Sequence, residues 1–125
     1  MTLRALLCVG AGGFCGAITR YLLSMWIDGQ LGSAFPWATL AINATGSFAL
    51  GALYGAIASL GLPPEVRLLL GVGFLGGYTT FSTFSVETVT LFERDAIGAG
   101  LAYVAASVAL SVLGAVLGLA LGRSL

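Results

Sequence analysis

Hydroxyl and aromatic side chains crowd one short stretch of an otherwise apolar chain. Residues 73–85 read GFLGGYTTFSTFS, with glycines first and then threonines, serines and two phenylalanines. Phe81 and Phe84 are three positions apart, with Ser82 and Thr83 between them. Aromatic ring edges carry positive potential and hydroxyls donate hydrogen bonds. Side chains of these two kinds could therefore surround a small anion.

Two further groups of polar side chains recur at helical spacing. Residues four positions apart lie on the same face of a helix. The first group is Thr39, Asn43 and Ser47, and the second is Tyr103, Ser107 and Ser111. An amide in hydrocarbon cannot be satisfied by its own helix, so Asn43 faces either another helix or a water-filled path. The spacing does not decide between these two.

Two ionisable residues fall inside apolar runs. Glu87 is a functional candidate because an ionisable group within a membrane is costly, and its alternative is a structural acceptor or a carboxyl near the interface. Arg20 either extends to the lipid headgroups or raises the anion concentration at the vestibule of a pore.

The composition predicts a membrane protein. The chain has 125 residues, of which 58% are hydrophobic and 8% are charged, and its mean hydropathy is +1.04. Ordinary soluble domains carry about a quarter charged residues. It has no histidine and no lysine, and Cys8 and Cys15 lie in an apolar run where thiols usually pack as small residues. At about 20 residues a span, the length predicts one four-helix transmembrane domain over residues 1–125.

The apolar runs predict an all-α membrane protein with four transmembrane helices per chain. The expected spans are about 6–27, 37–60, 68–92 and 98–121. The first resembles a secretory signal, but it is too long and lacks an Ala-x-Ala site. The third holds the stretch rich in glycine and hydroxyls. Irregular backbone at membrane depth is tolerated only where protein or water satisfies it, so we expect this helix to be broken mid-membrane beside a polar path.

The distribution of arginines does not strongly favour either orientation of the chain in the membrane. Short loops rich in lysine or arginine stay on the cytoplasmic side. Four spans would put Arg4, Arg67 and Arg123 on one side and Arg20 and Arg94 toward the other. A single copy of four small helices cannot readily enclose a pore, whereas two opposed copies could. We therefore predict an antiparallel, dual-topology homodimer.

The polar groups favour passage of a small anion. Hydrogen-bond donors dominate, whereas a cation path usually has rings of carboxylates or a filter of carbonyls. The sequence has no phosphate-binding loop, no nucleophile with its base and no cluster of metal-ligating side chains. We therefore expect no enzymatic activity and no nucleic-acid partner.

The same residues resemble the signature of a known family. The run at 73–85, with Gly12, Gly13 and Arg20 in the first span, Asn43 in the second, and Tyr103 with Ser107 in the fourth, is similar to the Fluc/CrcB fluoride channels. The resemblance covers essentially the whole chain. It implies a multi-pass protein of the bacterial inner membrane that exports fluoride passively. It also implies an antiparallel dimer with two pores, each built from both subunits and surrounded by lipid.

The resemblance also assigns residues to the fluoride path. The ring edges of Phe81 and Phe84 would face fluoride, with Asn43 as an amide donor beside them. The other residues of the implied path are Ser82, Thr83, Glu87, Tyr103, Ser107 and Ser111. The backbone carbonyls of Gly76 and Thr79 would hold a structural sodium ion at the dimer centre, in keeping with the preference of hard cations for oxygen ligands.

Two alternatives remain at this point. One is a proton-coupled transporter like the small multidrug exporters, which also have four short spans. Those proteins need an acid in the first span, where this chain has Arg20, and Glu87 lies in the third. The other alternative is a bundle that assembles but does not conduct.

Overall fold

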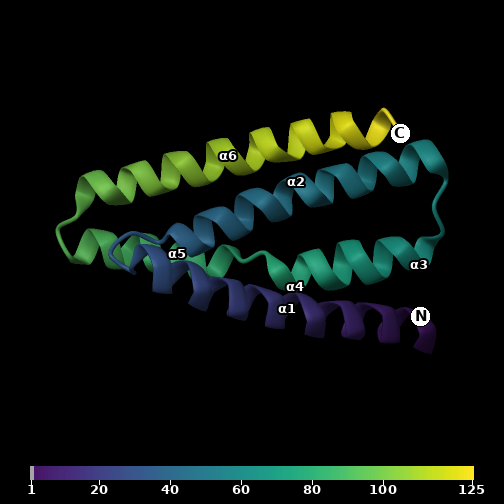
Figure 1. The fold of residues 1–125 in the computed structure, drawn as a ribbon, viewed down its shortest axis with the longest axis horizontal. Coiled ribbons are helices and arrows are strands. Elements are labelled where there is room, and N and C mark those ends of the chain that lie inside the picture. Colours follow the sequence, from purple (N-terminus) through teal and green to yellow (C-terminus); the bar gives the residue numbers. More distant parts are fainter. Residues whose placement is uncertain (1) are drawn as a thin grey trace.

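Long helices make up the chain in the computed structural model, which describes residues 2–125 (Figure 1). Their bounds are α1 Leu3–Leu31, α2 Trp37–Leu60, α3 Pro64–Val66, η1 Arg67–Leu75, α4 Gly76–Tyr78, α5 Phe81–Glu93 and α6 Ile97–Arg123. Four helical stretches are long and apolar enough to cross a membrane, with Pro64–Glu93 counted as one. The prediction of an all-α chain with four such helices and an interrupted third is confirmed.

The ends of α1 extend beyond the apolar run that predicted it. The helix covers Leu3–Leu31 because the Thr2 side chain caps its start by accepting from the Ala5 N–H, and because backbone hydrogen bonds continue through polar residues after position 27. It ends at Gly32, whose φ of 76° lies in the left-handed region that favours glycine. Helix α2 ends in the same way at Gly61, with φ 62°.

The third span is interrupted by two extended residues, Thr79 and Thr80. Their φ and ψ angles are −81° and 156°, and −151° and 120°. The short helix α4 precedes them, and before it η1 has π-helical hydrogen bonding over nine residues. Such bonding is rare and is mostly seen as single turns, often near functional sites. The sequence predicted the break but not this π-helical stretch.

Glycines bring the backbones of α2 and α6 into direct contact. A Cβ atom on Gly51 or Gly55 of α2 would collide with backbone atoms of α6, and one on Gly118 would collide with the carbonyl of Phe48. Small residues of this kind let membrane helices pack closely. The two helices therefore run side by side with no room for a side chain between them at these positions (Figure 1).

A second set of glycines joins α1 to the first half of the third span. The Cα atom of Gly12 lies against Gly73, Gly77 lies against Gly13, and Gly16 lies against Phe74. The first half of the third span is thus seated on α1 by backbone contacts.

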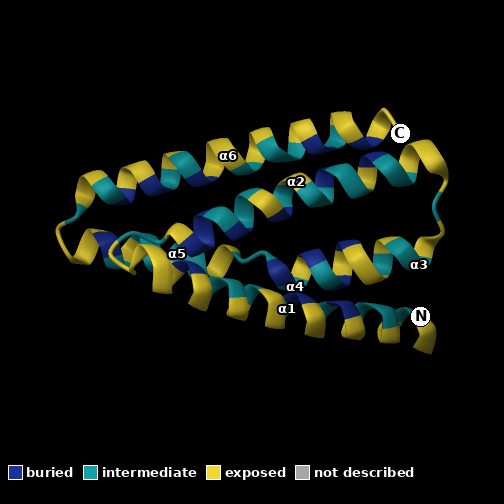
Figure 2. Cartoon of the chain, viewed as in Figure 1, coloured by how far each residue is buried: buried dark blue, intermediate teal, exposed yellow. Residues whose placement is uncertain are grey.

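Large apolar side chains cover the outside of the molecule. Figure 2 shows exposed residues along the outward sides of α1 and α6. The buried core is small and divided into two clusters, Leu40, Leu91 and Tyr103 in one and Ile42, Leu75 and Tyr78 in the other. An apolar surface of this extent is expected of a chain whose solvent is lipid.

Candidate functional site

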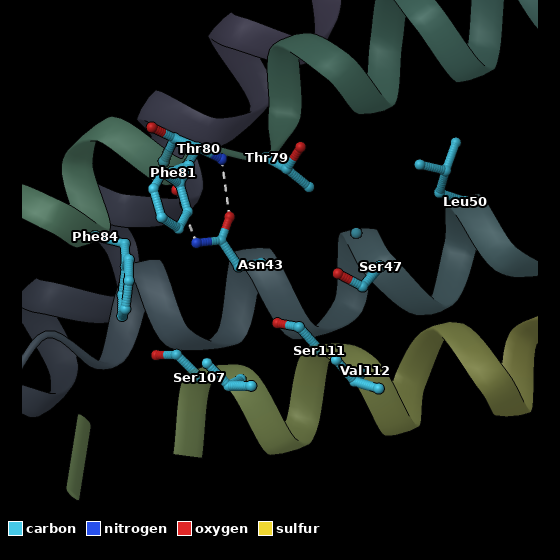
Figure 3. A pocket seen from close by; sticks show the side chains of 12 residues that line it. Asn43, Ser47, Leu50, Thr79, Thr80, Phe81, Phe84, Ser107, Ser111 and Val112 are labelled. Atoms are coloured by element: carbon cyan, nitrogen blue, oxygen red, sulfur yellow. Dashed lines mark hydrogen bonds between the residues drawn. The ribbon is translucent and has the colours of Figure 1, made fainter. Parts of the chain in front are cut away.

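A hollow of about 330 Å³ lies at the helix break, between α2, α5 and α6 (Figure 3). Its lining is Asn43, Gly46, Ser47, Leu50, Thr79, Thr80, Phe81, Phe84, Ser107, Val108, Ser111 and Val112. Five residues that the sequence assigned to an anion path meet in this hollow, namely Asn43, Phe81, Phe84, Ser107 and Ser111. Residues far apart in the sequence are brought together because α6 runs along α2 and the break in the third span lies beside both.

The Asn43 side chain binds the backbone at the break in the third span. Its Nδ2 donates to the Thr80 carbonyl at 2.8 Å, and its Oδ1 accepts from the Thr80 N–H at 2.8 Å (Figure 3). Backbone groups that lose their helical partners must be satisfied by other groups inside a membrane. The amide expected to serve an anion therefore already satisfies both backbone groups of Thr80, and one of its N–H groups remains.

Thr80 also caps α5. Its Oγ1 accepts from the Thr83 N–H at 3.3 Å and donates to the Thr83 Oγ1 at 3.0 Å. The capped end of α5 begins at Phe81, which lines the hollow. A helix N-terminus carries partial positive charge and favours anions. Ser82 is exposed and outside the lining, with only a 3.4 Å contact to the Thr80 hydroxyl.

Aromatic rings line one side of the hollow and continue beyond it. The centroids of Phe81 and Phe84 are 5.4 Å apart, and those of Phe84 and Tyr103 are 5.2 Å apart. Phe35, in the loop before α2, packs edge-on against Tyr103 at 5.6 Å. Phe81 is 78% exposed, so its ring lies on an open side of the single chain.

Glu87 lies beside the hollow, not in its lining. The Thr39 hydroxyl donates to Oε1 at 2.9 Å and the Tyr103 hydroxyl donates to Oε2 at 2.6 Å. Tyr103 is fully buried. Both carboxylate oxygens are thus occupied, and the Tyr103 hydroxyl, which sequence analysis placed on the path, is turned toward Glu87. Thr39 was missed as a site residue, although its spacing to Asn43 had placed both on one face.

Ser107 has a hydroxyl without a partner. Its Oγ is buried and forms no hydrogen bond within residues 2–125, and the residue is 7% exposed. A buried polar atom without a partner is uncommon and is often satisfied by water or a bound ion. Ser107 lines the hollow, so a hydrogen-bond donor without a partner lies at its wall.

Arg20 lies at the depth of the break, away from the ends of the helices. Its Nε donates to the Gly77 carbonyl at 3.1 Å. The predicted place of Arg20 at a vestibule stays a prediction. The hydrogen bond is not one that residue spacing could have predicted, because it depends on where the third span is interrupted.

Three carbonyls at the break remain free. In the part of the chain that the structure describes, no hydrogen bond ends on the carbonyls of Gly76, Tyr78 or Thr79, whereas those of Gly77 and Thr80 have side-chain donors. Within the same residues no group of three or more His, Cys, Asp or Glu side chains could hold a metal. Free carbonyl oxygens suit a hard cation, and Gly76 and Thr79 are two of the three.

Four polar or small residues of the lining were absent from the predicted fluoride path, namely Gly46, Ser47, Thr79 and Thr80. Thr79 had been predicted only as a backbone ligand of sodium. Ser47 could have been found from its place four residues after Asn43. Gly46 could not, because its part is to leave space for the side chains of Tyr78 and Thr79.

Known proteins similar to this chain were found by two comparisons. A family model described as "CrcB-like protein, Camphor Resistance (CrcB)" matches residues 7–119. A fluoride-specific ion channel of Rhodospirillum centenum is 53% identical over 106 residues, which is 84% of each chain. Proteins of the same description from Rhizobium meliloti and Agrobacterium fabrum are 49% and 47% identical, over 82% and 94% of this chain and 83% and 94% of their own lengths.

Proposed function

The chain belongs to the CrcB-like family, and we propose that it forms a fluoride-selective channel through which fluoride leaves a bacterial cell passively across the inner membrane. The family is not one of enzymes. The observation that carries the proposal is the hollow at the helix break, where Phe81 and Phe84 meet the hydroxyls of α6. Similarity to relatives described as fluoride-specific channels supports the choice of ion.

The chemistry of the hollow suits fluoride. Fluoride is small and strongly hydrated, so a pore must replace its water with good donors at close range. Ser107 offers a hydroxyl with no other partner, and Phe81 and Phe84 offer ring edges. None of the lining residues carries a full positive charge that would trap the ion, and conduction requires that an ion can leave as easily as it binds.

A second copy of the chain is part of the proposal. The hollow, at about 330 Å³, is far larger than a single small ion. One chain therefore does not surround a dehydrated ion, and Phe81 lies open on its surface. We propose an antiparallel homodimer in which two pores form, each between both copies.

The charges at the two ends of the helices support an antiparallel arrangement. One end carries Arg4, Glu65, Arg67 and Arg123, and the other carries Asp28, Glu93, Arg94 and Asp95. Opposed copies would bring a net positive end beside a net negative one, which is favourable. The arginine count by itself supports dual topology less than the sequence analysis expected. Arg20 lies at mid-depth, so three arginines remain at one end and one at the other, and a larger imbalance favours a single orientation.

A structural sodium ion at the dimer centre is also proposed. The carbonyls of Gly76 and Thr79 would hold it, since they have no other partner among residues 2–125. The ion would supply positive charge beside the C-terminal end of α4, where the helix dipole is negative.

Fluoride efflux from liposomes containing the purified protein tests the proposed function. We expect electrogenic fluoride loss with chloride nearly excluded. Phe84→Ile and Asn43→Ala should lower the efflux rate at least about tenfold, a barrier change of about 1.4 kcal/mol. Phe14→Ile is the matched control, because Phe14 is exposed on α1 away from the hollow.

The same liposomes separate the alternatives. Drug uptake driven by a proton gradient without a fluoride current would favour a multidrug exporter. The absence of any flux, or a flux unchanged by both substitutions, would favour a bundle that does not conduct.

A further inference from the structure

We propose that Arg20 is a positioning residue that caps the first half of the third span at the break, and that this hydrogen bond, not its charge, is what fluoride passage requires. The inference rests on the proposed function for its flux measurement. It concerns the contact between Arg20 and Gly77, which the fluoride path does not include.

The first half of the third span ends where its carbonyls lose their partners. A helix leaves its last carbonyls unpaired, and they carry partial negative charge. Because Thr79 and Thr80 are extended, the Gly77 carbonyl has no N–H four residues later in the same helix. Arg20 Nε donates to that carbonyl at 3.1 Å. The side chain thus satisfies a group that would otherwise be unpaired at membrane depth.

The packing of α1 explains how Arg20 reaches the break. Gly12, Gly16 and Arg20 are four residues apart, so they share one face of α1. Both glycines lie against the backbone of the first half, Gly12 near Gly73 and Gly16 near Phe74. The backbone contact brings α1 close enough for the next residue on that face to meet Gly77.

The charge of Arg20 has no acidic partner nearby. The one ion pair in residues 2–125 is between Arg4 and Glu65, at an exposed end of the bundle. A hydrogen bond from a charged donor is roughly twice as strong as one between neutral groups. The negative end of the half-helix is therefore the group that faces Arg20, and its Nε is directed there and not toward the headgroups.

Three substitutions separate the hydrogen bond from the charge. Arg20→Gln places an amide N–H at the same position along the side chain as Nε but removes the charge. Arg20→Met gives a side chain similar in length to glutamine, without the hydrogen-bond donor and without the charge. Arg20→Lys keeps the charge. Arg4→Gln is the matched control, because Arg4 is exposed and pairs only with Glu65.

Two readouts are needed, fluoride efflux from liposomes and the melting temperature in detergent. If Arg20 caps the break, Arg20→Gln should keep efflux within about twofold, while Arg20→Met should lose about tenfold or more, the factor that 1.4 kcal/mol represents. The melting temperature should fall in the order wild type, Arg20→Gln, Arg20→Met. The fluoride concentration that half-saturates efflux should be the same for Arg20→Gln as for wild type.

Two results would overturn the inference. One is an Arg20→Gln protein as impaired as Arg20→Met while Arg20→Lys conducts normally, since the charge would then be what matters. The other is wild-type melting and efflux in all three variants. If the wild type passes no fluoride, the proposed function fails, but the order of melting temperatures still decides whether Arg20 caps the break.

Discussion

The two halves of the third span are held in different ways. The first half, Pro64–Tyr78, is seated on α1 by glycine contacts and buries Gly71, Gly73, Leu75 and Tyr78. The second half, Phe81–Glu93, buries only Leu91. Phe81 is 78% exposed and Val86 is 66% exposed.

The difference shows which half of the third span is packed by backbone contacts and which half keeps an open face. Backbone contact through glycines leaves the first half no freedom to shift. The second half is held by side-chain hydrogen bonds, from Asn43 to Thr80 and from Thr39 and Tyr103 to Glu87. We infer that the first half fixes the break and that the second half, with its open face, is completed by another copy of the chain.

The largest expected effect comes from filling a glycine contact of the first half. Gly16→Ala puts a Cβ into the carbonyl of Phe74, a backbone atom that cannot move aside. Overpacking typically costs about 1–3 kcal/mol, and more where, as here, backbone has to move. We expect a large fall in the melting temperature in detergent. Gly10→Ala on the same helix is the control, because nothing lies within 4 Å of the added Cβ.

Asn43→Ala should come next in its effect on stability. It leaves the N–H and the carbonyl of Thr80 unpaired, and each such buried group costs about 1–3 kcal/mol. Asn43→Asp should also destabilise, because a carboxylate oxygen would replace the Nδ2 donor against the Thr80 carbonyl. Ser47→Ala is the control, since Ser47 lines the hollow without a side-chain hydrogen bond to residues 2–125. Equal melting temperatures for Asn43→Ala and Ser47→Ala would contradict the part given to Asn43.

Tyr103→Phe should have an intermediate effect. The substitution removes one donor to the Glu87 carboxylate, and hydrogen bonds to charged groups contribute about 1.5–3 kcal/mol. Thr39→Val removes the other donor. Because both donors serve one carboxylate, the free energies of unfolding in a double-mutant cycle should not add. Additive losses would mean that the two hydrogen bonds do not depend on each other.

Ser82→Ala should have the smallest effect. Ser82 is exposed and its hydroxyl has only a 3.4 Å contact with Thr80. Substitutions at such positions change the free energy of unfolding by about 0.5 kcal/mol or less. A loss as large as that of Tyr103→Phe would show that the second half is held as firmly as the first, and the comparison would fail.

The sequence predicted the helices well and their contacts less well. Hydropathy and glycine content were enough to predict four spans and a break in the middle of the third, because both depend on the solvent and on local backbone preferences. Spacing also placed Asn43, Ser107 and Ser111 on faces that do meet.

The spacing of polar residues along a helix could not predict which groups their side chains would bind. Asn43 is bound to Thr80, Glu87 takes two hydroxyls, and Arg20 donates to Gly77. Each contact depends on how far one helix is shifted along its neighbour. The glycine contacts set this shift, and a periodic pattern on one helix does not predict it. The functional part of each residue in the proposed path therefore stays a prediction until flux is measured.

The glycine contacts between α2 and α6 have a mechanical consequence. Ser107 and Ser111 stand on α6, and α6 cannot approach or leave α2 without disturbing contacts such as that between Gly118 and Phe48. The wall that carries these hydroxyls is therefore stiff, and it cannot widen for a larger halide unless a whole helix moves. We expect this rigid wall to limit the size of the ion that can pass once a second copy of the chain encloses the hollow.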